Sequence, residues 1–291
     1  MRFSLCLIDP PGYKFGHFLF DACRMIQGGL QDLGHDCAIR QNVVEKGRVN
    51  ILLGVHHVAS PAWVTELHAS RVPYVVMQTE ILDPGRINKV RDDGWWDRVF
   101  TPLVKGAVRT WDSSEPNLAV LRALGAGADA LEWGYTHAIE EVRHRADKDV
   151  DFFFYGSVTP HRREVLTKLD ELGYRVEVCF DQLAFYRNDL LARAEVLLTL
   201  RQSEAMAHLP WARILYGVAN RCLIAGESGL GQEPIADTFL WTEPKDVIEL
   251  LRETRARADR RALAEQFHDR MTKRPMSAGL EPLVKAIAER L

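Results

Sequence analysis

The stretch that decides the fold is DFFFYGSVTPHRREVLTKL, which runs from Asp151 to Leu169. Its aromatic run over residues 151–155 is typical of a buried strand, and the Gly156-Ser157 pair ends that strand. After the pair we predict a helix over residues 160–172, with cationic side chains in its first turn. The stretch therefore predicts a strand, a tight turn and a helix that begin a new unit in the middle of the chain.

Strands and helices alternate along both halves of the chain, which indicates βαβ units and parallel sheets. A strongly charged segment at 136–149 separates the two halves. We predict an α/β fold of two Rossmann-like domains that face each other across a cleft. The expected parts are an N-terminal domain at 1–140, a C-terminal domain at 150–270, and a C-terminal helix at 271–291 that returns to the N-terminal domain.

Length and composition bound the class of protein. A chain of 291 residues suits two domains, and a net charge of -3 gives no global positive field to attract nucleic acid. The five cysteines are widely spaced, and an odd number without a CxxC pair argues for a reducing compartment and against a disulfide frame or a zinc site. No stretch approaches the ~20 apolar residues of a membrane span, so we expect a cytoplasmic protein.

The turn after the predicted strand 151–155 has the features of a phosphate site. Open parallel sheets bind ligands at the carboxyl ends of their strands, where helix N-termini offer free N–H groups. Gly156 allows a ligand to approach the backbone closely, Ser157 can donate a hydroxyl, and Arg162 carries a fork of donors that suits phosphate oxygens. A tight turn with a solvated basic face explains the same residues. The chain has neither G-x-G-x-x-G after its first strands nor a P-loop motif, which argues against a dinucleotide or P-loop site.

A second polar segment runs from Thr199 to Gly229 and leaves the predicted strand 195–200. Acidic side chains at such a strand end can accept hydrogen bonds from ribose hydroxyls, and arginine can hold phosphate. Ion pairs between the arginines and the glutamates on the rim are the alternative. The candidate ligand-binding residues of this segment are Arg201, Glu204, His208, Arg213 and Glu227.

The segment RILYGVANRCLIAGES resembles the donor-site pattern R-I-F-E-A-L-A-C-G-x-L-L-L-T-D of family-1-like and spore-maturation-type glycosyltransferases, which have the GT-B fold. Arg213 and Glu227 match the pattern, whereas Tyr216 and Arg221 stand where the pattern has Glu and Gly. The usual ribose contact is then expected from Glu227 or Glu204. FYGSVTPHRREVLTKLDELGYRVEV resembles the opening of the same donor domain.

The first half resembles these enzymes at KFGHFLFDACRMIQGGLQDLGHDCAI, which is similar to their G-H-x-x-P…L…G-H-x-V opening. The resemblance implies that His17 is a base for the acceptor hydroxyl, since an imidazole titrates near neutrality. Helix capping or packing is the alternative role of His17. Asp9 and Glu80 follow strands and are rival bases. The pair His56-His57 also follows a strand, and we expect it to contact substrate rather than metal, because no carboxylate stands at helical spacing from it.

The resemblance implies a hexosyl- or pentosyltransferase that moves a sugar from a nucleotide-diphosphate donor to an unidentified acceptor without a metal or other cofactor. Nucleic acid, peptide, lipid and small-metabolite acceptors all stay open. A nucleotide-sugar epimerase on the same fold is one alternative. The other is a non-catalytic GT-B domain that binds a sugar or a nucleotide, because the pattern's Glu is missing at Tyr216.

Overall fold

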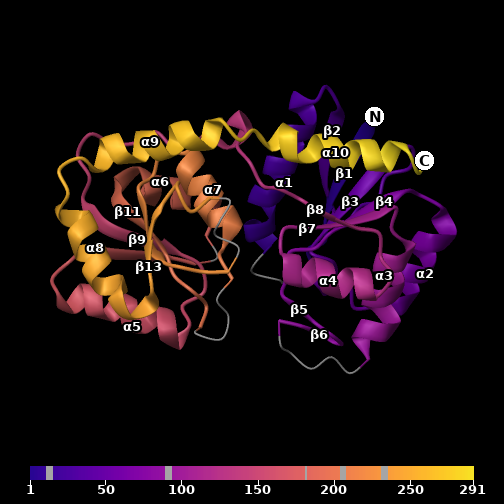
Figure 1. Cartoon of the computed structure of the whole chain (residues 1–291), viewed down its shortest axis with the longest axis horizontal. Helices are drawn as coiled ribbons and strands as arrows, with labels where there is room; N and C mark the ends of the chain where they lie inside the picture. Colours follow the sequence, from indigo (N-terminus) through magenta and orange to yellow (C-terminus); the bar gives the residue numbers. More distant parts are fainter. Residues whose placement is uncertain (11–15, 89–93, 181, 204–207, 231–234) are drawn as a thin grey trace. The chain divides into compact units, whose positions relative to one another are not determined.

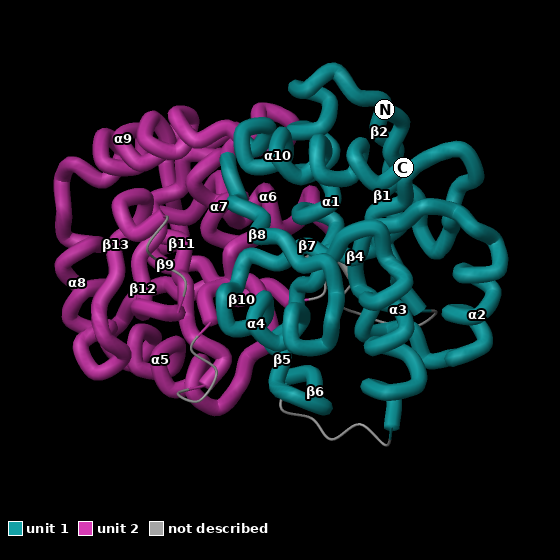
Figure 2. The backbone as a smooth tube through the Cα atoms, turned by 45° about the vertical axis from the view of Figure 1, so that its right-hand side comes forward, with its two compact units in different colours: residues 1–134, 276–291 teal, residues 135–275 magenta. Residues whose placement is uncertain are grey.

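The computed structural model describes residues 1–10, 16–88, 94–180, 182–203, 208–230 and 235–291, with only the backbone at 16–18. Its elements alternate along the chain (Figure 1) and divide into two compact units (Figure 2). Unit 1 comprises Met1–Gly134 and Met276–Leu291, and unit 2 comprises Tyr135–Pro275. The boundaries predicted near 140 and 271 lie a few residues from these positions.

Unit 1 is built on a parallel six-stranded sheet of order β2-β1-β3-β4-β7-β8. The inner strands β1, β3 and β4 are mostly apolar and buried because helices cover both faces of the sheet. Their bounds are β1 Arg2–Leu7, β2 Asp36–Gln41, β3 Val49–Leu53, β4 Tyr74–Met77, β7 Arg109–Asp112 and β8 Ala128–Ala130. A short antiparallel hairpin, β5 Leu82–Asp83 and β6 Arg86–Ile87, follows β4.

The two faces of this sheet have separate apolar cores. On one face α1 (Gly16–Asp32) packs against α10 (Met276–Ala288), which lies next to it in Figure 1. The other face carries α2 (Pro61–Ser70), α3 (Thr101–Gly106) and a π-helical turn at Trp96–Phe100. The helix α4 (Glu115–Ala123) also packs in this unit. The end of the chain thus completes the core that the start of the chain began.

Unit 2 is built on a parallel five-stranded sheet of order β10-β9-β11-β12-β13. The strand β9 (Val150–Tyr155) lies between two neighbours, and Phe152, Phe153 and Phe154 are fully buried, which explains the aromatic run. The other strands are β10 Val176–Cys179, β11 Ala194–Thr199, β12 Ile224–Glu227 and β13 Leu240–Thr242. The helices are α5 Pro160–Glu171, α6 Ala184–Arg193, α7 Trp211–Ala219, α8 Val247–Ala256 and α9 Arg260–Thr272.

The predicted elements of the second half are confirmed, from the strand at 151–155 to the strand near 221–225, although the last of these begins at Ile224. The short strand β13 was not predicted. The helix α5 begins as expected at Pro160, and Thr159 caps it by accepting a hydrogen bond from the Arg162 amide at 3.4 Å. Two parallel sheets with covering helices confirm the α/β fold class.

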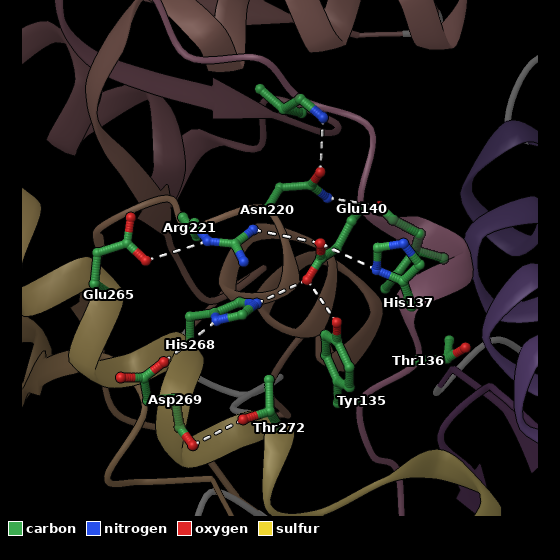
Figure 3. Close-up of polar contacts among 12 residues, drawn as sticks. Tyr135, Thr136, His137, Glu140, Asn220, Arg221, Glu265, His268, Asp269 and Thr272 are labelled. Carbon is green, nitrogen blue, oxygen red and sulfur yellow. Dashed lines mark hydrogen bonds and ion pairs between the residues drawn. The ribbon is translucent and has the colours of Figure 1, made fainter.

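Glu140 fixes the segment that enters unit 2 (Figure 3). It accepts hydrogen bonds from the Tyr135 hydroxyl at 2.6 Å and from His268 Nε2 at 2.8 Å, and its carboxylate lies 3.4 Å from Arg221. Burial raises the pKa of Glu140, but these hydrogen bonds and the arginine charge outweigh burial and hold the pKa at about 2. Next to this cluster, the Tyr135 amide donates to the Arg274 carbonyl at 2.8 Å. The entering and leaving segments of unit 2 are therefore tied to each other and to α9.

Glu140→Gln is expected to lower the melting temperature of unit 2 at pH 7. A carboxylate whose pKa falls on folding, here from 4.5 to about 2, stabilises the fold above pH 4.5 and loses that effect as the pH drops through the folded value. The difference from the wild type should thus shrink between pH 4.5 and 2 in calorimetric melts. Glu171→Gln on the exposed side of α5 is the control. A difference that stays constant with pH would contradict this role of the Glu140 charge.

Candidate functional site

Gly156 follows β9 and sits against an arginine of α7. Its φ of 136° is rarely adopted by residues with a side chain, and a Cβ built at this position would lie 2.5 Å from Arg213 Nη2. The Gly156 amide donates to the Cys179 carbonyl at 2.9 Å, which continues the pairing of β9 with β10. Glycine is therefore required here by backbone conformation and by the close approach of Arg213, a different reason from the ligand approach that the sequence predicted.

Arg213 is a buried charge in unit 2. Its guanidinium stacks on the rings of Phe154, 4.8 Å from the ring centre, and Tyr155, at 5.2 Å, and only 6% of the residue is exposed. Nε and Nη1 are buried, and among the described residues they have no hydrogen-bond partner and Arg213 has no ion pair. Burial lowers the pKa of Arg213 to about 10. A buried cation is costly unless an anion or hydrogen-bond acceptors meet it, so the guanidinium has the chemistry to hold an anionic group.

Arg162 also lies over Phe154 but has a different role. Its guanidinium stacks on that ring at 5.2 Å and donates to the carbonyls of Ser157, at 2.9 Å, and Leu200, at 3.1 Å. Nη1 also lies 3.2 Å from the Ser157 hydroxyl. Burial, and next the charge of Arg213, lower the pKa of Arg162 to about 9. Arg162 thus clamps the turn after β9 to the end of β11 and adds positive potential beside Arg213.

Glu227, at the end of β12, is engaged by neighbouring loops. Its Oε1 accepts from His161 Nε2 at 2.8 Å, and its Oε2 accepts from the Arg201 amide at 2.6 Å. The Arg201 side chain turns to Ser228, donating to its carbonyl at 2.6 Å and its hydroxyl at 2.8 Å. Glu227 is almost fully buried. These contacts join the first turn of α5 to the ends of β11 and β12, and the alternative of an Arg213–Glu227 ion pair is not formed.

Of the other predicted ligand-binding residues of unit 2, the structure describes Ser157 and His208. The Ser157 side chain faces Arg162, as above. His208 forms an isolated parallel bridge with Leu230, beyond the end of β12. Glu204 lies outside the described residues. The sequence analysis did not single out His161, which contacts Glu227. Its position in the first turn of the helix that follows β9 was the signal that could have identified it.

Polar side chains also gather at the carboxyl ends of the strands of unit 1. Asp9 follows β1 and accepts from Gln41 Nε2 at 2.7 Å. His56 and His57 form a 3-10 turn after β3, with ring centres 3.8 Å apart. Glu80 follows β4, and its Oε1 lies 3.6 Å from His56 Nδ1. His17 lies in the first turn of α1, and its side chain is outside the described part of the chain.

Burial shifts the pKa of both imidazoles of the 3-10 turn toward the neutral form. Burial lowers the pKa of His56, and the Glu80 carboxylate partly opposes that shift. Burial and then the neighbouring His56 lower the pKa of His57 to about 4. Neutral imidazoles accept as well as donate hydrogen bonds, so this edge of the sheet suits a ligand with hydroxyl groups.

Asp112 and Asn117 support the same edge and were missed from the sequence. Asn117 Nδ2 donates to the Glu80 carbonyl and to Asp112 Oδ2, both at 2.8 Å, and its Oδ1 accepts from the Leu82 amide at 2.9 Å. Burial raises the pKa of Asp112 to about 7 against these hydrogen bonds. Asp112 is the last residue of β7, and Glu80 follows the end of β4. The position of Asp112 at a strand end was therefore the signal that could have identified it.

Within the described ranges, no group of three or more His, Cys, Asp or Glu side chains is arranged to hold a metal ion. Over the same ranges, none of the helices has the length and apolar character that a membrane crossing requires.

No protein-family model and no curated protein sequence matches the chain. Several solved structures do. AviGT4, a glycosyltransferase involved in avilamycin A biosynthesis, matches with a TM-score of 0.59 and 14% identity over 99% of this chain and 97% of its own. HepE of Anabaena, in complex with UDP, matches with a TM-score of 0.59 and 10% identity over 99% of each chain. The trehalose-6-phosphate synthase OtsA matches with a TM-score of 0.55 and 10% identity over 93% of this chain and 76% of its own.

These likenesses confirm the fold that the resemblance implied. The chain has the GT-B glycosyltransferase fold, with an α/β unit of parallel strands in each half.

Gly156→Ala should lower the free energy of unfolding of unit 2 by about 1–3 kcal/mol, because it strains the backbone and drives a methyl group into Arg213. Part of this cost should disappear in an Arg213→Ala background, which removes the steric conflict, so the two substitutions should not be additive. Denaturant unfolding of the single and double variants measures the coupling. Gly173→Ala is the matched control, since its φ is 84° and nothing lies within 4 Å of the added Cβ. Equal effects of Gly156→Ala in both backgrounds would contradict the contact.

Proposed function

We propose that this protein is a glycosyltransferase that moves a hexose or pentose from a nucleotide-diphosphate donor to an acceptor. The observation that carries the proposal is the buried Arg213 guanidinium, whose Nε and Nη1 have no hydrogen-bond partner among the described residues. It lies next to Gly156, where the absence of a side chain allows a ligand to approach closely. A diphosphate supplies the missing negative charge and several acceptor oxygens at once. Its departure from the sugar leaves additional negative charge on the phosphate oxygens, which a fixed guanidinium stabilises in the transition state.

The same charges support transfer without a metal ion. Arg213 and Arg162 both stack on the ring of Phe154, and neither forms an ion pair with a carboxylate among the described residues. The N–H groups of Arg162 donate to carbonyl oxygens, which fix the position of the side chain. Because these oxygens carry no formal charge, they leave the positive charge of Arg162 unneutralised. We assign direct phosphate contact to Arg213, support to Arg162, and backbone approach to Gly156 and Ser157. Arg201, Glu204, His208 and Glu227 remain candidates for the rest of the donor.

Fold likeness favours this proposal over a generic anion site. HepE was solved with UDP, a nucleoside diphosphate, and AviGT4 is named as a glycosyltransferase. For unit 1 we propose acceptor binding, with His17, Asp9 and Glu80 as the candidate bases from the sequence. The acceptor can be any molecule with a suitable nucleophile, nucleic acid included.

Arg213→Ala should weaken binding of UDP, GDP or ADP, whichever binds the wild type, by about 1.5–3 kcal/mol, the range for a charge-assisted hydrogen bond. Isothermal calorimetry measures the loss, and circular dichroism checks that the fold is kept. Arg252→Ala is the control, since that arginine is exposed and pairs with Glu249 on its own helix. Unchanged affinity in a folded Arg213→Ala protein would assign Arg213 to structure alone and remove the basis of the proposal.

Incubation with single nucleotide sugars separates the proposal from its two alternatives. An epimerase converts the sugar without an acceptor, and a binding module only raises the melting temperature. A transferase releases the nucleoside diphosphate, slowly to water and faster when an acceptor is present. Accumulation of an epimeric nucleotide sugar would contradict the proposed transfer.

A further inference from the structure

The strand β10 is an edge of the sheet of unit 2, and its outer side is open. Among the described residues it pairs with β9 alone. The Gly156 amide donates to the Cys179 carbonyl at 2.9 Å, so the backbone groups of Cys179 point toward β9. Because these groups alternate in direction along a strand, those of Val176 and Val178 point away from β9. A further strand can pair with these outward N–H and C=O groups.

Apolar side chains lie next to this open edge. Sheet edges are commonly protected from pairing by charged residues, prolines or bulges. The apolar residues that line a groove of about 370 Å³ between β10 and α5 are Val158, Leu166, Val176 and Val178. Val178 is 41% exposed, and Leu172 before the strand and Phe180 after it are exposed as well. The edge therefore combines unpaired backbone groups with an apolar surface.

The groove carries opposite charges at its two ends. Arg163 and Asp170 line it, with Thr167 between them on the same face of α5. Because α5 connects the parallel strands β9 and β10, it runs antiparallel to both. Arg163, in the first turn, thus lies toward the carboxyl end of β10, and Asp170, in the last turn, lies toward its amino end. Both residues are exposed, and neither has an ion pair within the described ranges.

We propose that a second copy of this chain pairs with the outer side of β10, so that the sheets of two copies of unit 2 join across a two-fold axis. Such an axis makes the two β10 strands antiparallel and sets the two α5 helices side by side on one face of the joined sheet. Arg163 of each copy then approaches Asp170 of the other. This self-complementary charge favours a second copy over an extended segment of another protein. Dimer formation of this kind is independent of the proposed transferase function.

The side chains of β10 favour one register of the two strands. With Val178 on the axis, the two copies of this residue exchange both N–H···O bonds and pack together on the α5 face. Glu177 then lies opposite Cys179. With Glu177 on the axis, two carboxylates would oppose each other, which destabilises a strand pair. We therefore expect Val178 at the centre of the interface.

Sedimentation equilibrium of the full chain over a concentration series measures the association. The wild type should form a concentration-dependent dimer. Val178→Asp should be monomeric at concentrations where the wild type is dimeric, because it places two carboxylates at the axis. Circular dichroism should show an unchanged fold, since the side chain is partly exposed. Val43→Asp, at a residue of unit 1 that is 49% exposed, is the control and should dimerise like the wild type.

Two results would overturn the proposal. A wild type that is monomeric at every concentration would leave β10 to an extended segment of another protein. A Val178→Asp protein that remains dimeric would place the dimer contact elsewhere on the chain.

Charge reversal tests the antiparallel arrangement itself. Arg163→Glu should weaken the dimer by about 10-fold, because it replaces two attractive contacts with Asp170 by two repulsive ones. Asp170→Arg should weaken it for the same reason. An equimolar mixture of the two variants should recover the dimer, because both contacts of the mixed pair join opposite charges. A mixture that is no more dimeric than either variant alone would overturn the pairing.

A cross-link locates the axis on α5. If the two charge pairs form, the axis passes close to Thr167, which lies between the charged residues. Thr167→Cys should then give a disulfide-linked dimer on mild oxidation, because the five natural cysteines are buried. Lys168→Cys is the control, since Lys168 is exposed but does not line the groove. Linkage that is absent at 167, or equally strong at 168, on a non-reducing gel would overturn the proposed interface.

Discussion

The buried guanidinium of Arg213 is the constraint on which the rest of unit 2 depends. It stacks on the rings of Phe154 and Tyr155, in a position that only a glycine at 156 leaves open. Aromatic faces lower the cost of holding the charge, but they give no acceptor for its N–H groups. Because a hydrophobic residue would fill this space at lower cost, an arginine that has no ion pair among the described residues makes sense when a ligand supplies the anion, as in the proposed function.

Both units use the same property of parallel sheets, although they display different chemistry. In a parallel sheet the carboxyl ends of the strands lie at the same edge, where loops lead into helices. Residues that are distant in sequence therefore become neighbours at this edge. In unit 2 this edge carries arginines backed by an aromatic strand, which suits phosphate. In unit 1 the edge carries Asp9, His56 and Glu80, whose neutral imidazole and fixed carboxylate suit hydroxyl groups. The division between donor and acceptor in the proposed function follows from this difference in charge.

The sequence predicted the strands and helices well, because β9 and α5 each obey one local rule: a buried aromatic run in the first and a Thr-Pro start in the second. It also placed Gly156 at a strand end and Arg213 on the helix that follows the strand at 195–200. What it could not give was the direction of side chains. Glu227 was expected to face a ribose, yet its oxygens accept from His161 and the Arg201 amide, which is a matter of loop geometry. His56 follows β3 and Glu80 follows β4, and the two come together because these strands are neighbours in the sheet.

Tyr216 shows how a departure from a family pattern can be explained physically. The pattern has Glu at this position of α7, whereas here a fully buried tyrosine lies with its ring 4.0 Å from the Arg187 guanidinium. Its hydroxyl is 3.0 Å from Glu141 Oε2 and 2.8 Å from Asn188 Oδ1. A glutamate would bring a second carboxylate against Glu141, whereas the hydroxyl can donate to it. The side chain at 216 is thus committed to packing inside unit 2, and any ribose contact must come from another residue. Under the proposed function, Arg213 then contributes more of the donor's affinity than the family pattern requires.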